Sequence, residues 1–459
     1  MKNNEKFNRT FKISLIAAAL GLANQAWAAE VQCNTATGVS INNQNGATLN
    51  NCVITQPLQK EYYLTKINVT NSQDVSINHS KISISGDEWS GIRVKDASAT
   101  LNNVELSASN PTRGSSIGIE MTNSTVNING GKYTTTSNRN TLEAFRLINS
   151  TLNAKNVQIS LNGIANDGIS LEENSTANLE NVTLTATNEA SPIIYDASNN
   201  SNSVVKITNS KINSHFELLD VRWDVQNDTV GKLAITVDNS SLQAPIFLLA
   251  GSDKYLENGH TVKLNEHHSL TAKNSSTLNG LIAVDNDEES TISLNLDHSS
   301  WTTNSLSFED EDNTTVTITP SVTNLDLNNG VVTLEKNDNF QTLTIFNNLT
   351  GSGTFNLNTN IAENKGDKII VQGSAEGNHK IGVTNQGANV ANRKLTLVET
   401  KGGNGAFSLT NPNNRVDLGA YQYFLTKEGN NWVLADSQSA VNPETPAQPT
   451  PNTPSTPST

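Results

Sequence analysis

The sequence predicts an all-β fold, a right-handed parallel β-helix (solenoid), in which short strands stack turn upon turn. Three observations predict it. Apolar and polar residues alternate in short segments, and these segments recur at a period of about 25 residues, which is typical of a solenoid. Residues that tolerate a left-handed backbone recur with them.

The alternation is clearest in three segments of ten residues. They read Ser-Thr-Leu-Asn-Ala-Lys-Asn-Val-Gln-Ile at 150–159, Ser-Thr-Ala-Asn-Leu-Glu-Asn-Val-Thr-Leu at 175–184 and Ser-Val-Val-Lys-Ile-Thr-Asn-Ser-Lys-Ile at 203–212. A period of two residues is typical of a strand that buries one face. No helical period separates these strands, which argues against a βαβ protein.

The repeat is seen when the segments are aligned on one inward-facing residue. The intervals between aligned positions are 24, 27, 26, 25, 28, 30, 35, 24 and 22 residues. The aligned residues are Ile77, Leu101, Ile128, Ala154, Leu179, Ile207, Val237, Ala272, Leu296 and Ile318. A second strand in each repeat is indicated by Ile92/Val94, Ile117/Ile119, Phe145/Leu147, Ile169/Leu171 and Ile193/Tyr195.

A column of Asn, His and Gly stands two residues after the first nine aligned positions. Its predicted turn ladder consists of Asn103, Asn156, Asn181, Asn209, Asn239 and Asn274, with His79, Gly130 and His298 at the remaining turns. These residue types tolerate the left-handed conformation and predict one tight bend repeated in every turn. An antiparallel sandwich does not explain such a column, and right-handed winding is the usual sense for parallel strands.

The N-terminus has the features of a secretory signal peptide over 1–28. Basic residues, among them Lys2 and Arg9, precede an apolar stretch over 13–23 and the small residues of Ala26-Trp27-Ala28. Because an exported chain meets an oxidising compartment, Cys33 and Cys52 are expected to form a disulfide within an N-terminal cap at 29–60. The β-helix would follow at 61–324.

The net charge of -14 disfavours nucleic acid as a partner, because phosphate binding needs a concentrated cationic surface. The mean hydropathy is -0.42. After the signal peptide, no stretch of the sequence is both apolar and long enough to cross a membrane as a helix.

The C-terminal quarter carries a more specific pattern. Its landmarks are Leu325-Asp-Leu-Asn-Asn-Gly-Val-Val-Thr-Leu334, Leu349-Thr-Gly-Ser-Gly-Thr-Phe355, Gly366-Asp367, Gly373, Gly377-Asn-His379, Phe407, Val416-Asp-Leu-Gly-Ala-Tyr421 and Trp432-Val-Leu434. In this order they resemble the C-terminal passenger segment of pertactin-like autotransporters, the autochaperone region, over 325–436.

The resemblance implies type V secretion, in which the chain crosses the outer membrane through a β-barrel translocator and its C-terminal turns fold first. It also implies a place on the bacterial surface or outside the cell, reached through the periplasm. In this interpretation Gly351, Gly353, Gly366, Gly373 and Gly377 allow turns and bulges, and Phe355, Phe407, Tyr421 and Trp432 fill and cap the last turns. Ordinary loop glycines and core aromatic residues would look the same locally. The Pro- and Thr-rich stretch at 437–459 is typical of an extended linker.

No catalytic site, cofactor or metal site is predicted. Asp220 with Asp224, and Asp285 with Asp287, are the candidate carboxylate pairs for a glycan-cleaving β-helix, but their spacing is equally typical of solvated loops. The acidic runs 285–289 and 309–312 do not have the spacing of a calcium loop, and His267-His268 has no third ligand in a recognisable spacing. An exposed histidine pair is therefore expected.

The longest repeats point to a binding surface. They hold Phe216, Trp223, Tyr255 and His260 within 213–265, and long loops on a rigid solenoid often carry binding function. Trp223 and Tyr255 are therefore candidate partner-binding residues. Packing of these aromatic side chains inside wider turns is an equally open interpretation.

The predicted function is that of a non-enzymatic adhesin or virulence factor. It would contact a host cell-surface receptor, a matrix protein or a glycan. Self-association between bacteria in autoaggregation or biofilm, a released ligand of a host receptor, and a glycan-active enzyme are the alternatives.

Overall fold

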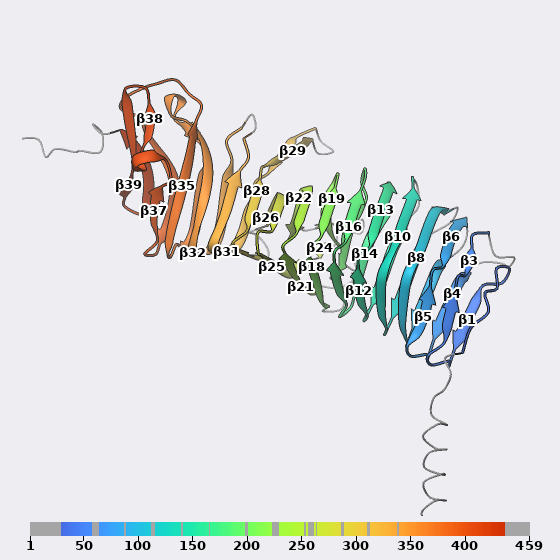
Figure 1. Ribbon diagram of the computed structural model, residues 1–459. Helices are drawn as coiled ribbons and strands as arrows, with labels where there is room; N and C mark the ends of the chain where they lie inside the picture. The colour runs from blue at the N-terminus through green and yellow to red at the C-terminus, as the bar shows by residue number, and fades with distance from the viewer. Residues whose placement is uncertain are drawn as a thin grey trace, which may run out of the picture.

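The chain forms an elongated rod of about 12 turns, with β1 (Val39–Asn42) at one end and β39 (Tyr421–Glu428) at the other (Figure 1). The computed structural model describes residues 29–56, 64–86, 89–111, 115–138, 141–164, 166–197, 201–222, 229–251, 254–255, 261–262, 264–285, 289–309, 313–336 and 339–436. The predicted signal peptide and linker lie outside these ranges. The predicted all-β solenoid is confirmed.

Like strands of successive turns pair in parallel and form three columns along the rod, which we call faces A, B and C. Face A contains β1, β4 (Thr65–Thr70), β7 (Ser90–Lys95), β9 (Ser116–Thr122), β11 (Leu142–Ile148), β14 (Asn166–Glu172), β17 (Ser191–Asp196) and β20 (Glu217–Arg222). Face B contains β2 (Thr48–Asn50), β5 (Val75–Asn78), β12 (Thr151–Lys155), β15 (Thr176–Glu180), β18 (Asn202–Thr208), β21 (Thr229–Asp238), β25 (Leu264–Lys273) and β27 (Thr291–Asp297). Face C contains β3 (Val53–Ile54), β6 (Lys81–Gly86), β13 (Gln158–Gly163), β16 (Thr183–Ala186), β19 (Lys211–Ser214) and β28 (Ser300–Thr303).

Several longer strands cross a corner and serve two or three faces. They are β8 (Ser98–Pro111), β10 (Thr125–Ser137), β22 (Ser241–Ala250), β26 (Thr277–Val284), β31 (Ser321–Leu334) and β32 (Thr342–Asn360). The last turns are built by β33 (Lys365–Gly366), β34 (Lys368–Ser374), β35 (Asn378–Asn385), β36 (Lys394–Gly402), β37 (Ala406–Leu409), β38 (Val416–Leu418), β39 and β40 (Asn431–Asp436), with the short 3-10 helices η2 (Ile361–Glu363) and η3 (Pro412–Asn414).

The aligned inward residues pair on face B as expected, with one exception at the end of the series. Ile77 pairs with Leu101, and the pairing continues turn by turn to Ala272 with Leu296. Leu296 then pairs with Leu327, so the prediction of Ile318 is wrong. Ile318 ends β30 (Thr315–Ile318), which forms an antiparallel hairpin with β29 (Leu306–Glu309). Apolar and polar residues alternate along the strands of this inserted hairpin, so its sequence resembles that of a solenoid turn.

The second strand of each repeat lies on face A, where one register assignment was also wrong. Ile92 pairs with Ile119 and Val94 with Met121, two residues later than the Ile117/Ile119 alignment. Both Ile117 and Ile119 are buried, and of the two Ile119 belongs to the main apolar core. A Cβ at Gly118 would lie 2.5 Å from the Ala144 carbonyl oxygen.

All nine residues of the predicted bend column have positive φ, from 46° at Asn239 to 72° at Gly130. Some of their amides also bond along the rod. Asn181 Nδ2 donates to Asn156 Oδ1 at 3.2 Å, and Asn239 Nδ2 donates to Asn209 Oδ1 at 2.7 Å. A second left-handed column, between faces A and B, was not predicted. It comprises Asn43, Asn71, Asp96, Asn123, Asn149 and Glu173.

Buried serines follow many of the left-handed residues and form a ladder of hydrogen bonds through the corners. The backbone N–H of Ser124 donates to Ser150 Oγ at 3.1 Å, and that of Ser150 donates to Ser175 Oγ at 3.2 Å. The other corner repeats the arrangement from Ser210 to Ser240, at 2.9 Å. Each of these serine hydroxyls accepts a hydrogen bond from the preceding turn and also donates one to a carbonyl of its own turn. Ser150 Oγ, for example, donates to the Ile148 carbonyl at 2.8 Å. The corners therefore satisfy backbone donors that no strand can pair.

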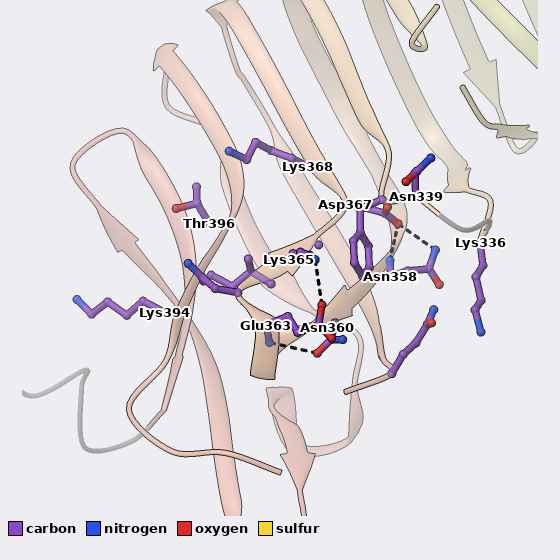
Figure 2. A pocket seen from close by; sticks show the side chains of 15 residues that line it. Lys336, Asn339, Asn358, Asn360, Glu363, Lys365, Asp367, Lys368, Lys394 and Thr396 are labelled. Carbon is purple, nitrogen blue, oxygen red and sulfur yellow. Dashed lines mark hydrogen bonds and ion pairs between the residues drawn. The ribbon is translucent and has the colours of Figure 1, made fainter. Parts of the chain in front are cut away.

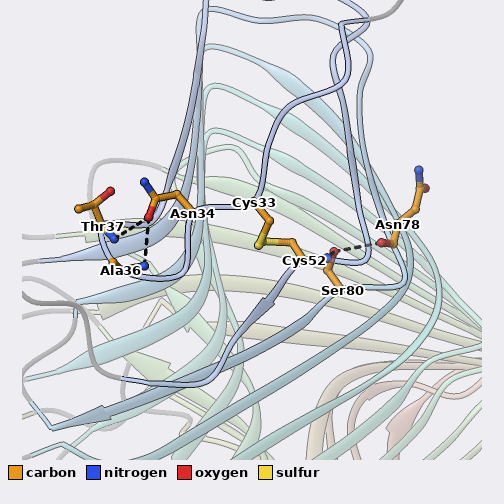
Figure 3. Close-up of a disulfide and its surroundings, with 7 residues drawn as sticks. All are labelled: Cys33, Asn34, Ala36, Thr37, Cys52, Asn78 and Ser80. Atoms are coloured by element: carbon orange, nitrogen blue, oxygen red, sulfur yellow. Dashed lines mark hydrogen bonds between the residues drawn. A yellow bond between two sulfur atoms is a disulfide. The ribbon is translucent and has the colours of Figure 1, made fainter.

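The two ends of the rod are closed differently. At the N-terminal end, Cys33 and Cys52 form the predicted disulfide, with Cα atoms 5.3 Å apart, and it ties the first loop to the corner after β2 (Figure 3). At the other end, β40 pairs antiparallel with both β36 and β39. The pairing of β40 covers strand edges that would otherwise be free to pair with another chain.

We expect Ser150→Ala to destabilise the turns around it by about 1–3 kcal/mol, because the Ser124 N–H would be left buried without an acceptor. Hydrogen exchange in β10, β12 and β15 measures the loss. Ser107→Ala is the control, since Ser107 is exposed and its hydroxyl bonds only to Ser83 on the surface. Equal protection in both variants would contradict a supporting role for the ladder.

Candidate functional site

A group of charged side chains lies on the outer side of face A, across successive turns. We call it the face A charge cluster, and it consists of Arg93, Glu120, Glu143, Arg146, Asp167, Glu172, Glu217, Asp220 and Arg222. Strand pairing places its members side by side. Arg146 aligns with Glu120 on the preceding turn, and Glu143 aligns with Asp167 on the following turn.

Most of the cluster is organised into ion pairs. Arg222 holds Asp167 with two bonds, Nη1–Oδ2 at 2.7 Å and Nη2–Oδ1 at 3.0 Å, and its Nε lies 2.7 Å from Asp220 Oδ2. Arg146 Nε donates to Glu172 Oε1 at 2.6 Å. The bonds to Asp167 and Glu172 run between turns, so they fix planar groups in one arrangement on a rigid sheet.

Arg93 and the Trp89 indole share the carboxylate of Glu120. Arg93 Nε lies 3.5 Å from Glu120 Oε2, and Trp89 Nε1 donates to the same oxygen at 3.2 Å. This pair extends the cluster toward the N-terminal end of the rod.

Glu143 is the member whose carboxylate is least compensated. The residue is 8% exposed, and its Oε2 has no hydrogen-bond partner among the described residues. Among the described residues the closest cation is Arg146, whose Nε is 3.9 Å away and is already bonded to Glu172. Burial raises the pKa of Glu143 to about 7, which Arg146 opposes and Asp167 reinforces.

The neighbouring carboxylates differ because each has a partner. Burial also raises the pKa of Asp167, but the bonds from Arg222 oppose the shift. Burial raises the pKa of Glu217 most, and repulsion from Asp220 raises it further. The Ser191 hydroxyl, which donates to the Glu217 carboxylate at 2.7 Å, opposes the shift. The cluster therefore contains one carboxyl that changes charge near neutral pH beside carboxylates that are held by donors.

We expect Glu143→Gln to stabilise the chain above pH 7 and to leave it unchanged near pH 4. The folded pKa is raised above the unfolded one, so folding favours the protonated carboxyl and stability falls as the pH rises between the two values. Thermal unfolding at both pH values measures the difference. Glu180→Gln, which removes an exposed carboxylate paired with Lys155, should show no such gain, and a gain equal to that of Glu143→Gln would contradict the assignment.

A polar hollow of about 720 Å³ lies near the C-terminal end between β32, β34 and β36 (Figure 2). Lys336, Lys365, Lys368 and Lys394 surround it, and the last three are paired with Glu363, Glu399 and Glu428. Asp367 has a structural part here. It accepts bonds from the Gln341 and Asn358 backbone N–H groups, both at 2.6 Å, and so joins two turns.

The predicted binding residues remain predictions. Trp223 lies outside the described residues. Tyr255 belongs to β23 (Lys254–Tyr255), which pairs antiparallel with β24 (Thr261–Val262) in a small hairpin inserted in the solenoid. Phe216, from the same region, is 44% exposed.

Each candidate carboxylate pair has one member outside the described residues, so both pairs stay predictions. Asp220 bonds to Arg222, while Asp224 and Asp287 lie outside the described ranges. The expectation of an exposed histidine pair is wrong for His268, which is buried and has its Nε2 3.2 Å from Glu266 Oε2. Alternation explains this result, since neighbouring residues of a strand point to opposite sides. In the part of the chain that the structure describes, no group of three His, Cys, Asp or Glu residues is arranged to hold a metal ion.

Sequence reasoning missed the face A charge cluster because its members come from separate turns. The signal was present in the repeat, because aligning the face A strands places Glu143 beside Asp167. The two-residue error at Ile117 hid a different contact, that of Glu120 with Arg146.

Comparison with known proteins gives a family match for the C-terminal part of the chain. Residues 322–436 match the family model described as Pertactin. The C-terminal part is therefore that of an autotransporter passenger.

The chain carries a pertactin-like passenger domain.

The passenger is similar to two curated autotransporters of Escherichia coli. Probable autotransporter YpjA of strain K12 is 44% identical over 99 residues, which are 21% of this chain and 6% of YpjA. Autotransporter adhesin/invasin TibA of E. coli O78:H11, strain H10407, is 30% identical over 205 residues, 44% of this chain and 18% of TibA. The matches thus span a small part of each relative.

A solved structure, the autotransporter UpaB of E. coli strain CFT073, aligns with a TM-score of 0.49 and 13% identity, over 88% of this chain and 99% of that one. Among the described residues no helix is long and apolar enough to cross a membrane.

Within the pertactin-like segment, several predicted residues have structural parts. Phe355 and Phe407 are buried, and the rings of Phe355, His379, Phe407 and Trp432 follow one another with centroids 5.9, 5.2 and 5.6 Å apart. The expectation that Tyr421 fills the last turns is wrong, because it is 37% exposed and Tyr423, two residues later, is fully buried.

Gly377 has the most confined backbone in this segment. Its φ is +95°, and a Cβ there would lie 1.8 Å from the Gly351 carbonyl oxygen of the preceding turn. We expect Gly377→Ala to destabilise the segment by about 1–3 kcal/mol, since both the conformation and the space exclude a side chain. Hydrogen exchange over 343–409 measures the effect.

Gly402→Ala is the matched control, because a Cβ at Gly402 would meet no atom within 4 Å. Equal losses of protection in the two variants would contradict a specific requirement at Gly377.

Proposed function

We propose that this passenger acts without catalysis, as an attachment protein on the bacterial surface that contacts host cells or their matrix. The observation that carries the proposal is the alignment of 44% of the chain with a relative named as an adhesin/invasin, on a rod that presents polar, paired side chains along its outer sides. A stiff rod holds such a surface away from the cell. Export through the periplasm and passage through an outer-membrane translocator belong to this proposal.

The partner is a host receptor, a matrix protein or a glycan. The inserted β23–β24 hairpin supports a contact in the region of the longest turns, because hairpins that leave a solenoid are free to differ without disturbing its strands. Trp223 and Tyr255 are the proposed contact residues of this region.

A binding assay on cultured epithelial cells with labelled, purified passenger tests the proposal. Saturable binding is expected, and Trp223→Ala with Tyr255→Ala should weaken it about tenfold, which is roughly 1.4 kcal/mol. Phe308→Ala is the control, since Phe308 is an exposed aromatic residue of the other inserted hairpin, β29–β30.

The alternatives predict other outcomes in parallel assays. Settling of bacteria that display the passenger, without binding to host cells, would favour self-association. A host response to the soluble passenger without attachment would favour a released ligand, and release of reducing sugars from host glycans would overturn the non-enzymatic role.

A further inference from the structure

The face A charge cluster has more negative than positive groups. Its six carboxylates are Glu120, Glu143, Asp167, Glu172, Glu217 and Asp220, and its three guanidinium groups are Arg93, Arg146 and Arg222. The carboxylates are carried by paired strands rather than by mobile loops. Their backbones therefore cannot move apart to relieve the repulsion.

The surplus is concentrated at Glu143. Arg222 is engaged by Asp167 and Asp220, and Arg146 by Glu172 at 2.6 Å. Glu143 Oε2 is buried and has no hydrogen-bond partner among the residues that the structure describes, and it lies 3.9 Å from Arg146 Nε of the cluster. Such an oxygen normally has a donor when its residue is buried.

The cluster is open to solvent at its margin. The Arg146 and Arg222 side chains are 28% and 47% exposed, whereas that of Asp167 is only 3% exposed. A ligand can therefore approach over the arginines, but Glu143 Oε2 itself is covered, so a narrow group reaches it only after the side chains above it move aside.

A ligand that compensates Glu143 Oε2 must donate hydrogen bonds and carry positive charge. An ammonium is compact and has three donors, whereas a guanidinium is broad and needs a carboxylate presented edge-on. A sugar hydroxyl can donate but does not compensate the surplus charge. A divalent cation is disfavoured, since the described residues include no metal-binding group of three.

We propose that the outer surface of face A around Glu143 binds a protonated primary amine, whose ammonium donates to Glu143 Oε2 while the ion pairs of Asp167 and Glu172 hold the surrounding surface in place. The amine is either the side chain of a lysine in an extracellular peptide or a free polyamine. Amine binding at this site is a property separate from the proposed attachment to host cells, and it can be measured on the purified chain alone.

Binding is coupled to the protonation of Glu143. Arg146, Asp167, Glu172 and Arg222 are the charged groups that act on this carboxyl, and burial raises its pKa to about 7. An ammonium favours the ionised carboxylate, so binding is expected to strengthen as the pH rises through that value and to release a proton.

Titration calorimetry with spermidine and, separately, with a capped Gly-Lys-Gly-Lys-Gly peptide tests the site at low ionic strength, because salt screens exposed charges. Wild-type protein is expected to bind at about pH 8 and at least tenfold more weakly at about pH 5.5, where Glu143 is mostly protonated. Tighter binding of spermidine assigns the site to polyamines, and tighter binding of the peptide assigns it to lysine side chains.

Three variants separate this site from general attraction to an acidic protein. Glu143→Gln should weaken binding about tenfold while keeping the wild-type circular dichroism spectrum, and Glu143→Asp, which keeps the charge, should lose less. Glu180→Gln removes one exposed carboxylate from face B and should change nothing. Absence of binding by both probes, or equal affinity in Glu143→Gln and wild type, would overturn the proposal, as would equal losses in Glu143→Gln and Glu180→Gln.

Discussion

Hydrogen bonds between the backbones of successive turns hold this molecule together, and almost every other feature follows from them. A strand in the middle of the rod pairs in parallel with one strand before it and one after it, as β12 does with β10 and β15. The pairing requires each turn to return to the same register, so a residue meets its equivalent in the next turn. Inward positions are therefore filled with aliphatic residues that stack on one another, and stability accumulates from neighbour to neighbour along the rod.

The corners meet the same constraint with polar groups. Three flat faces can close into a turn only if the chain bends sharply between them, and left-handed residues at the bends leave backbone N–H groups pointing along the rod. Serine hydroxyls supply their acceptors, as Ser150 and Ser240 do. Extra residues can enter only where they leave the pairing intact. Both inserted hairpins, β23–β24 and β29–β30, pair within themselves rather than with a face.

The same constraint explains how far the sequence alone could lead. The inward column from Ile77 to Leu296 could be aligned because aliphatic residues recur before a left-handed Asn or His in each turn. The second bend column was missed because Asp96 and Glu173 interrupt its asparagines, and these residues give a weaker signal. Ile318 was misplaced because a hairpin has the same two-residue period as a turn. The face A charge cluster depends on register between turns, and a shift of two residues, as at Ile117, separates groups that the fold places together.

Outer side chains of a solenoid are freer than inner ones, which bears on the meaning of Glu143. The residues aligned with it on face A are Ile117, Asp167 and, one turn further, Ser191. Isoleucine and serine are accepted in this column, so the pairing of strands does not require a carboxylate. Asp167 is compensated by Arg222, but Glu143 is buried with one oxygen that no described residue meets with a hydrogen bond. A buried charge without a partner opposes folding, and such departures from local consistency are expected where a surface serves a ligand rather than the fold. Glu143 is thus better explained by what approaches face A from outside than by what lies beneath it.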